Sequence, residues 1–109
     1  MTSITVKKGD KLVFVKLDTV VYFQAKDKYV EVITAKENQL TAQSLVQLEK
    51  KLPQNFLRVH KSFVINKNYV KDVQKYFNGR YIISFTDGTK ESTTTGRSYG
   101  AAVIEWLEN

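Results

Sequence analysis

The stretch FLRVHKSFVIN, residues 56–66, combines an apolar run typical of a buried strand with three polar side chains in its middle. Leucine, valine, isoleucine and phenylalanine suit a buried sheet, but Arg58, His60 and Lys61 interrupt them. His60 is also the only histidine of the chain. An imidazole and two cations therefore lie inside an otherwise apolar run.

The order of side chains in this stretch predicts a strand that ends in a corner. Residues 57–60 alternate between apolar and polar side chains, as in a strand with one wet face, and Lys61-Ser62 breaks the alternation. Because serine is a favourable helix N-cap, Ser62 predicts a turn of helix over 63–65. The apolar flanks would then hold His60, Lys61 and Ser62 outwards, where their polar groups can meet phosphates or base edges.

The segment before this stretch, SLVQLEKKLP at 44–53, has the period of a helix. Ser44 and Gln47 stand at the spacing of a capping box, leucines follow at helical intervals, and Pro53 ends the pattern. A helix this short is marginal alone in water, so we expect its leucine face to pack on a sheet.

The rest of the chain is mostly strand-like. Strands are expected, in chain order, on both sides of Gly9-Asp10 and at 20–25, 29–34 and 40–42. The dipeptides Asn78-Gly79 and Asp87-Gly88 suit two-residue hairpin turns, and they predict a three-stranded meander over 70–95.

The tail, SYGAAVIEWLEN, returns to helical spacing. Ser98 is a candidate N-cap, and Val103, Trp106 and Leu107 fall on one side of the expected helix. Gly100 near its start is unfavourable for a helix interior. The sequence thus predicts a fold that is mainly β with short helices.

Length and composition indicate one globular domain over residues 1–109. Hydrophobic residues make up 42% and charged residues 26%, which argues against disorder. No apolar run approaches the ~20 residues of a membrane span, and the start of the chain lacks the pattern of a signal peptide. We therefore expect a cytoplasmic protein with no membrane partner.

The residue inventory argues against catalysis and metal binding. The chain has no cysteine and one histidine, so thiolate chemistry and histidine clusters are excluded. Neither a phosphate-binding glycine loop nor a dinucleotide fingerprint occurs. The sequence predicts no enzyme, no metal site and no cofactor.

The positive charge of the chain is its most informative bulk property. Seventeen Lys and Arg residues against eleven Asp and Glu residues give a net charge of +6, and the sequence pI is near 9.5. Basic side chains are concentrated in residues 58–75, where five cations face a single acid. A clustered basic surface is typical of a nucleic-acid-binding protein, although it can also be a solvated face.

The run SLVQLEKKLPQNFLRVHKSFVINKNYVKDV, residues 44–73, resembles the signature of the LytTR DNA-binding domain, the output module of many bacterial LytR/AlgR-type response regulators. A short capped helix leads into Phe56, then into an Arg-x-His-basic-Ser segment and an apolar pair before Asn66. The flanking stretches VVYFQAKDKYVEV and GRYIISFTDGTKE are also similar, and the resemblance covers residues 11–107.

The resemblance implies an elongated stack of small antiparallel β-sheets whose loops, rather than a recognition helix, contact double-stranded DNA. The residues that match the family's contact regions are Lys26, Lys28, Tyr29, His60, Lys61 and Arg97. Arg97 is the candidate for a bidentate contact with guanine. Lys61 is the candidate for a base or a phosphate, and Lys26 and Lys28 for the DNA backbone. Two copies would bind repeated promoter sites as a homodimer, with a receiver domain absent from these residues.

Several alternatives stay open at this point. The chain has Gly96 and Lys61 where the family often has serine and arginine. Arg58 could pair with an acid across a sheet, Asn66 fits a backbone cap better than a DNA contact, and His60 fits a structural corner as well as a base contact. A basic β-rich protein-interaction or ligand-sensing module is the alternative function. Single-strand or RNA binding would need exposed stacking platforms, for which the candidates are Tyr29, Tyr76 and Tyr81.

Overall fold

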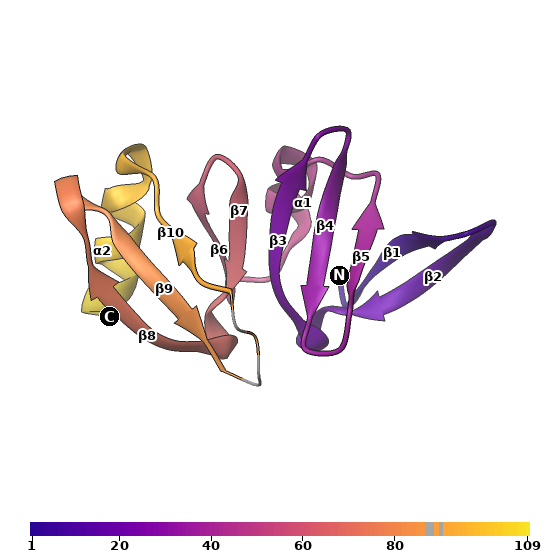
Figure 1. Cartoon of the computed structure of the whole chain (residues 1–109), viewed down its shortest axis with the longest axis horizontal. Helices are drawn as coiled ribbons and strands as arrows, with labels where there is room; N and C mark the ends of the chain where they lie inside the picture. Colours follow the sequence, from indigo (N-terminus) through magenta and orange to yellow (C-terminus); the bar gives the residue numbers. More distant parts are fainter. Residues whose placement is uncertain (87–88, 90) are drawn as a thin grey trace.

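The computed structural model describes residues 1–86, 89 and 91–109, and it consists mostly of antiparallel β-strands. The molecule is elongated, with principal extents of 44 × 27 × 24 Å, and its elements are arranged along the long axis (Figure 1). The fold expected from the sequence, mainly β with short helices in an elongated stack of sheets, is confirmed.

The first seven strands form one antiparallel sheet in the order β2-β1-β5-β4-β3-β7-β6. Their bounds are β1 Ser3–Lys8, β2 Lys11–Lys16, β3 Val20–Lys26, β4 Tyr29–Thr34, β5 Asn38–Thr41, β6 Phe56–His60 and β7 Phe63–Asn66. The hairpin expected at Gly9-Asp10 joins β1 to β2, with Lys8 paired to Lys11 and Gly9 at φ 63°.

A second sheet of three strands has the order β10-β9-β8. Its strands are β8 Val70–Lys75, β9 Tyr81–Phe85 and β10 Thr93–Thr94. The expected meander is therefore confirmed. Asn78 and Gly79 both have positive φ, 56° and 71°, as a tight hairpin turn between β8 and β9 requires. The turn expected at Asp87-Gly88 lies outside the described residues.

The capping box predicted at the first helix is present. Helix α1 (Leu45–Lys51) starts after Ser44, whose side chain accepts from Gln47 N, while the Gln47 side chain accepts from Ser44 N. Leu45 and Leu48 are buried against the large sheet in a cluster, as the helical leucine spacing predicts. That cluster contains Ile4, Val6, Leu17, Val20, Phe23, Val30, Val32, Leu45, Leu48, Phe56 and Val64.

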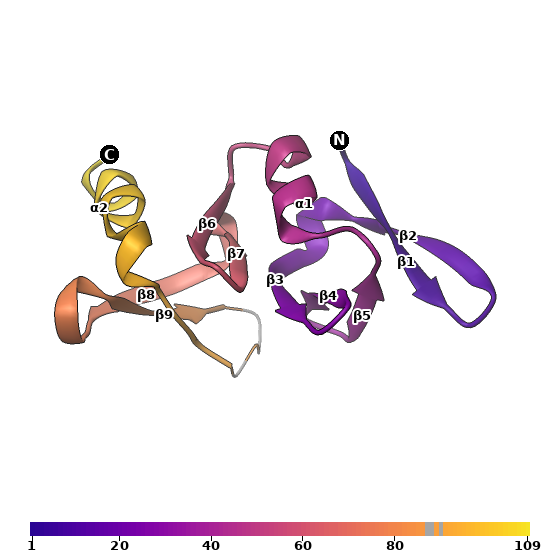
Figure 2. The same cartoon turned by 90° about the horizontal axis from the view of Figure 1, so that it is seen from above.

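The opposite face of β3, β7 and β6 packs against the three-stranded sheet and helix α2 (Gly100–Glu108) in a second core. The buried members of this core are Val21, Tyr22, Ile33, Val59, Ile65, Ile83, Phe85 and Val103. Figure 2 shows α1 and α2 on the same side of the strands, with α2 at one end of the molecule and α1 near its middle. The large sheet thus separates two cores.

Two details of the second helix differ from the sequence prediction. Its N-cap residue is Tyr99, not Ser98, and no side chain caps it. The 3-10 turn η4 (Arg97–Tyr99) precedes the helix and includes Ser98. Leu107 is exposed, whereas Val103 is buried and Trp106 packs against the second core. Further 3-10 turns lie at η1 Leu17–Thr19, η2 Lys67–Tyr69 and η3 Phe77–Gly79.

The turn of helix predicted over 63–65 is wrong, because these residues belong to strand β7. Phe63 pairs with His60 of β6 and with Gln24 of β3, so β7 has a neighbour on each side. Pairing along both edges of a strand outweighs the local preference of serine for a helix cap. The corner itself is confirmed as a hairpin turn, and the carbonyl oxygen of Ser62 accepts from Ala25 N over 2.9 Å.

Within the described part of the chain, no helix is both long and apolar enough to cross a membrane.

Candidate nucleic-acid interface

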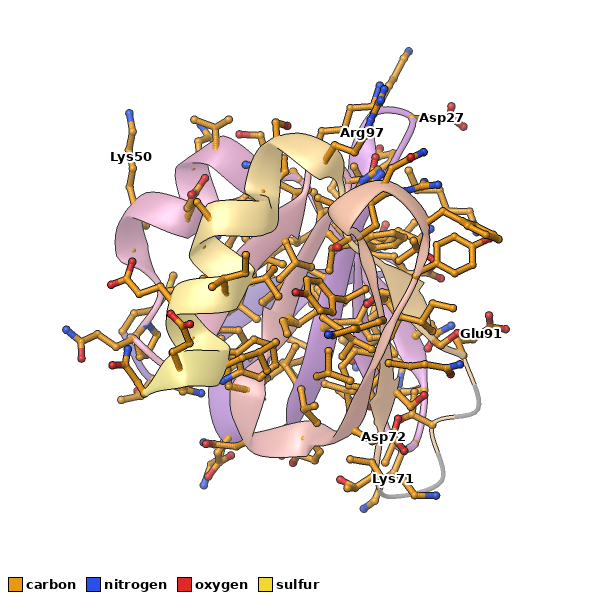
Figure 3. The ribbon with its side chains drawn as sticks, turned by 90° about the vertical axis from the view of Figure 1, so that its left-hand side faces the viewer. Asp27, Lys50, Lys71, Asp72, Glu91 and Arg97 are labelled. Carbon is orange, nitrogen blue, oxygen red and sulfur yellow. The ribbon has the colours of Figure 1, made fainter. Side chains whose placement is uncertain are left out.

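Three loop segments lie along one edge of the molecule, the upper edge in Figure 1. They are the β3–β4 turn at 26–29, the β6–β7 corner at 60–62 and residues 96–97 before η4. We call these segments together the loop edge. Backbone bonds of 2.9 Å link them in series, from Ala25 N to Ser62 O and from Gly96 N to Val59 O. Seen along the long axis, Arg97 and Asp27 project at the same end of the strands (Figure 3).

The β3–β4 turn presents two exposed lysines. Asp27 adopts a positive φ of 54° at the turn, and Lys26 pairs with Tyr29 across it. The Lys26 ammonium group lies 3.8 Å from the Glu31 carboxylate but keeps 64% of its side chain exposed. Such an exposed pair contributes little to stability, so Lys26 can exchange it for a phosphate.

The guanidinium of Arg58 holds the backbone of the corner. Its Nε donates to the carbonyl oxygen of His60 over 2.9 Å, and its Nη2 donates to that of Lys61 over 2.6 Å. Nη1 binds the Glu49 carboxylate on α1 at 2.9 Å. The Arg58 side chain is only 13% exposed, so it shapes the corner from beneath. The acid pairing left open by the sequence is thus made with a helix rather than across a sheet.

His60 is a hydrogen-bonded corner residue. Its Nδ1 accepts from the backbone N–H of Ser62 over 2.9 Å, and its ring lies 5.1 Å from the ring of Phe63. Burial lowers the pKa of the imidazole, and the charges of Lys61, Arg58 and Arg80 lower it further. The structure therefore favours neutral His60 with Nδ1 as the acceptor, which leaves Nε2 with a hydrogen to donate.

Lys61 projects from this corner and is exposed. A depression of about 270 Å³ separates it from the β3–β4 turn, and Lys28 and Arg58 also contribute to its lining. Its other walls come from the start of α1, including Ser44. Two lysines from different loops thus flank one hollow on the loop edge.

Arg97 is exposed at the first position of η4, directly after Gly96. A Cβ atom added to Gly96 would lie 3.3 Å from both His60 Cδ2 and Tyr99 Cδ2. Because the backbone of residue 96 packs so closely on the imidazole, the position of Arg97 is tied to that of the corner. Gly96, which stands where the family often has serine, is therefore a packing residue.

Asn66 is fully buried and makes three hydrogen bonds. Its Nδ2 donates to Val20 O over 2.8 Å, and its Oδ1 accepts from Asn68 N and Asn55 Nδ2. The expectation that Asn66 caps the backbone is confirmed. Its bond to Val20, from a distant strand, has no local signal in the sequence.

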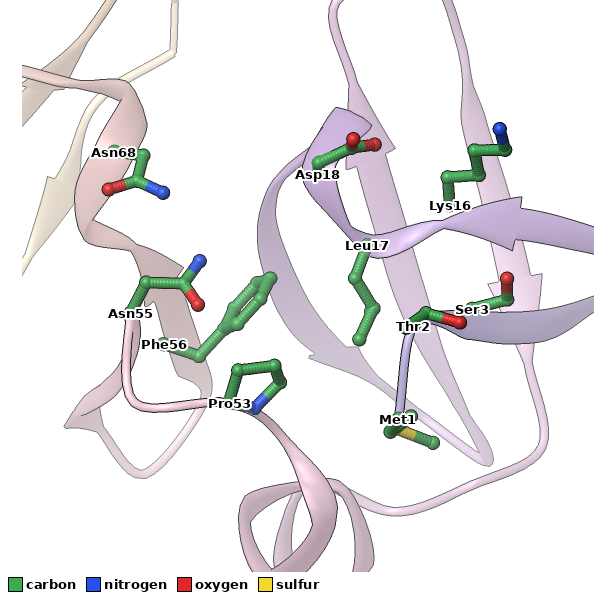
Figure 4. Close-up of a pocket in the computed structure, with 10 residues that line it drawn as sticks. All are labelled: Met1, Thr2, Ser3, Lys16, Leu17, Asp18, Pro53, Asn55, Phe56 and Asn68. Carbon is green, nitrogen blue, oxygen red and sulfur yellow. The ribbon is translucent and has the colours of Figure 1, made fainter.

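Two further hollows differ in whether they include predicted contact residues. One, of about 650 Å³, is lined by Lys26, Asp27, Lys28, Tyr29 and Leu40 at the β3–β4 turn. A pocket of about 450 Å³ lies between the start of β1, η1 and the loop before β6 (Figure 4). Leu17 and Phe56 contribute apolar walls, and Asp18 and Asn68 lie at its polar side. Among the described residues no group of three or more histidine or acidic side chains could hold a metal ion.

Exposed cations on three linked loops of a β-rich fold are typical of a class of protein, the DNA-binding domains that contact DNA without a recognition helix. The family model described as the LytTr DNA-binding domain matches residues 10–108. The chain belongs to this family, and it is accordingly a DNA-binding domain of the kind found in transcriptional regulators.

Relatives and a solved structure agree with this assignment. Sensory transduction protein LytT of Bacillus subtilis is 39% identical over 83 residues, which are 75% of this chain and 34% of the relative. Transcriptional regulatory protein LytR of Staphylococcus aureus is 31% identical over 98 residues, which are 89% of this chain and 39% of the relative. A LytTr DNA-binding domain from Bacillus cereus has a TM-score of 0.90 at 27% identity and covers 100% of this chain and 99% of its own.

The chain spans about a third of the length of the curated relatives that it matches.

Proposed function

We propose that this chain binds double-stranded promoter DNA in a sequence-specific manner and serves as the effector domain of a bacterial two-component response regulator. The observation that carries the proposal is the loop edge, where three neighbouring segments with exposed cations lie along one edge of the molecule (Figure 1). Phosphate contacts supply affinity, and contacts with base edges supply sequence preference.

Different side chains of the loop edge supply the affinity and the sequence preference. Arg97, whose guanidinium fork fits O6 and N7 of guanine, reads a base in the major groove. Lys61 reaches a base or a phosphate, and Lys26 and Lys28 bind the DNA backbone. Tyr29 supports their turn, with its ring beneath the ammonium of Lys7 at 5.4 Å. His60 positions Lys61 and can donate from Nε2 to the DNA.

We also propose how the protein assembles on DNA and where in the cell it acts. Residues 1–109 act as one domain, two copies occupy repeated sites as a homodimer, and a receiver domain elsewhere in the protein controls them. The domain binds DNA without catalysing a reaction, and it works in the bacterial cytoplasm, where promoters are. Membership of a DNA-binding family supports the DNA partner, and the names of two relatives, a sensory transduction protein and a transcriptional regulatory protein, support the regulatory role.

Selection of bound duplexes from a random pool tests the proposal and yields the site. We expect one enriched motif, whose affinity falls steeply with salt. Arg97→Ala should flatten the preference at one base pair, whereas Lys26→Ala should weaken all duplexes alike and reduce the salt slope by about one. Equal affinity for selected and unrelated duplexes at physiological salt would refute sequence-specific binding.

A further inference from the structure

The tip of the β8–β9 hairpin, residues 76–80, exposes two aromatic rings that neither core uses. Phe77 is 70% exposed and Tyr76 is 42% exposed. Packing therefore does not explain them. Two adjacent exposed rings, unlike a single exposed side chain, form a small apolar surface on which a partner can pack.

The tip is closed by backbone hydrogen bonds and by contacts among its side chains. Backbone bonds close it from Tyr76 N to Arg80 O at 3.0 Å and from Arg80 N to Phe77 O at 3.1 Å. The two rings lie 4.8 Å apart, and the Arg80 guanidinium lies over the Tyr76 ring at 5.2 Å. Because these contacts fix the rings beforehand, binding through them costs little conformational entropy.

The tip lies next to the loop edge. Gly79 O is 3.7 Å from a Cβ atom added to Gly100, just after η4, and Tyr81 N donates to Thr95 Oγ1 at 2.9 Å. Arg80 is also close enough to His60 to lower its pKa. Figure 1 shows the β8–β9 tip on the same upper side as the β3–β4 and β6–β7 turns, beyond the segment that carries Arg97.

The charge of the residues around the tip indicates what kind of partner binds there. Residues 73–86 contain Lys75 and Arg80 and no acidic residue, which favours a polyanion. We propose that the β8–β9 tip is a fourth contact with duplex DNA, in which Phe77 packs on the apolar surface of a nucleotide and Arg80 binds a neighbouring phosphate. This inference rests on the proposed function, since the loop edge brings the duplex to the tip.

The dimensions of the molecule allow this contact. The β3–β4 turn, the β6–β7 turn, the segment that carries Arg97 and the β8–β9 tip follow one another along the 44 Å long axis, on the upper side of the molecule (Figure 1). A duplex that follows the loop edge from the β3–β4 turn past Arg97 therefore runs on toward the tip. The apolar surfaces that DNA offers there are thymine methyl groups and deoxyribose faces.

Affinity for the selected duplex at fixed salt tests the proposal with Phe77→Ala, Phe77→Leu and Phe14→Ala. Phe14 is the matched control, because it is 73% exposed on β2 at the other end of the molecule. We expect Phe77→Ala to weaken binding about five- to tenfold, as for the loss of one aromatic contact with a nucleotide, and Phe77→Leu to weaken it less. Phe14→Ala should bind like the parent protein, and all three variants should keep its melting temperature.

Replacing each thymine of the duplex by deoxyuridine then identifies the surface. If removing the methyl group at one position weakens duplex binding by the parent protein but not by Phe77→Ala, the contact is with that methyl group. If Phe77→Ala weakens duplex binding but no deoxyuridine substitution does so, the contact is with deoxyribose. If the parent protein binds the selected site and Phe77→Ala binds it within twofold, the fourth contact is refuted while the proposed function stands. If the parent protein shows no site preference, both fail.

Discussion

Arg58 and Lys61 are joined by a hydrogen bond of 2.6 Å from the guanidinium Nη2 to the backbone carbonyl oxygen. The same guanidinium binds His60 O and the carboxylate of Glu49, so three parts of the chain meet at one largely buried cation. Arg58, which lies beneath the corner, therefore fixes the backbone from which the exposed Lys61 side chain projects.

Replacing Arg58 by methionine should damage both stability and DNA binding. Methionine keeps an apolar stem but donates no hydrogen bonds, so the carbonyl oxygens of His60 and Lys61 lose their partner. We expect the free energy of unfolding to fall by about 1–3 kcal/mol and duplex affinity to fall further than this loss of folded protein explains. Urea unfolding and titration with the selected duplex measure the two effects.

Glu49→Ala is the control for this variant, because it removes only the ion pair. Glu49 is 51% exposed, and a pair of this kind contributes less than about 1 kcal/mol. An equal loss of affinity in both variants would show that the ion pair, not the bonds to the corner carbonyls, positions Lys61.

Stability should decline as the pH falls below about 6.5, the ordinary pKa of histidine, because of His60. Burial and the nearby cations lower its pKa in the folded state. The unfolded chain therefore takes up the proton first, so stability is fully present above the unfolded pKa and is lost as the pH falls through the folded one. Protonation of Nδ1 would also remove the acceptor for Ser62 N.

His60→Asn checks this pH dependence, since asparagine offers an acceptor near Nδ1 but does not titrate. Melting temperatures between pH 5 and 8 should vary less in His60→Asn than in the parent protein. His60→Ala should be less stable than His60→Asn at pH 8. Identical pH profiles for the parent protein and His60→Asn would assign the acid sensitivity to other groups.

Asn66→Ala should destabilise the fold without a specific effect on DNA binding. The substitution leaves Val20 O and Asn68 N without this partner in a fully buried position, at a cost of about 2–4 kcal/mol. Asn68→Ala, at an exposed position of the same turn, should change stability by less than about 0.5 kcal/mol. Calorimetry checks the melting temperatures. If Asn66→Ala melted like the parent protein but bound DNA weakly, Asn66 would be a DNA contact and not a structural cap.

The elements that could be predicted from the sequence are those that local chemistry determines. The Ser44 capping box and the Asn78-Gly79 turn each satisfy backbone groups within a few residues. The turn of helix at 63–65 was wrong because β7 is fixed by β3, about 40 residues earlier in the chain. Ser98 failed as a cap for a related reason, since the tail is positioned by packing of Val103 and Trp106 on distant strands.

The candidate site was predictable in its residue types but not in its supporting contacts. Exposed lysines and Arg97 follow from charge and resemblance, and the structure places them on neighbouring loops. The bonds from Arg58 to the corner, and the packing of residue 96 on His60, depend on how separate strands meet. In the sequence, such contacts are visible only as an arginine or a glycine. Either residue could stand at its position for several different structural reasons.

Gly96→Ser and Gly100→Ala should have opposite effects on stability. The Cβ that the first substitution adds would lie 3.3 Å from the rings of His60 and Tyr99, so one ring must move, and we expect a loss of about 1 kcal/mol and weaker duplex binding. At Gly100, in α2, the added Cβ meets only Gly79 O at an ordinary 3.7 Å. Alanine there should raise stability by about 0.5–1 kcal/mol through its better helix propensity. Thermal melts and duplex titrations measure both variants, and a Gly96→Ser protein of parental stability and higher affinity would show that the rings yield easily and that the added hydroxyl contacts DNA.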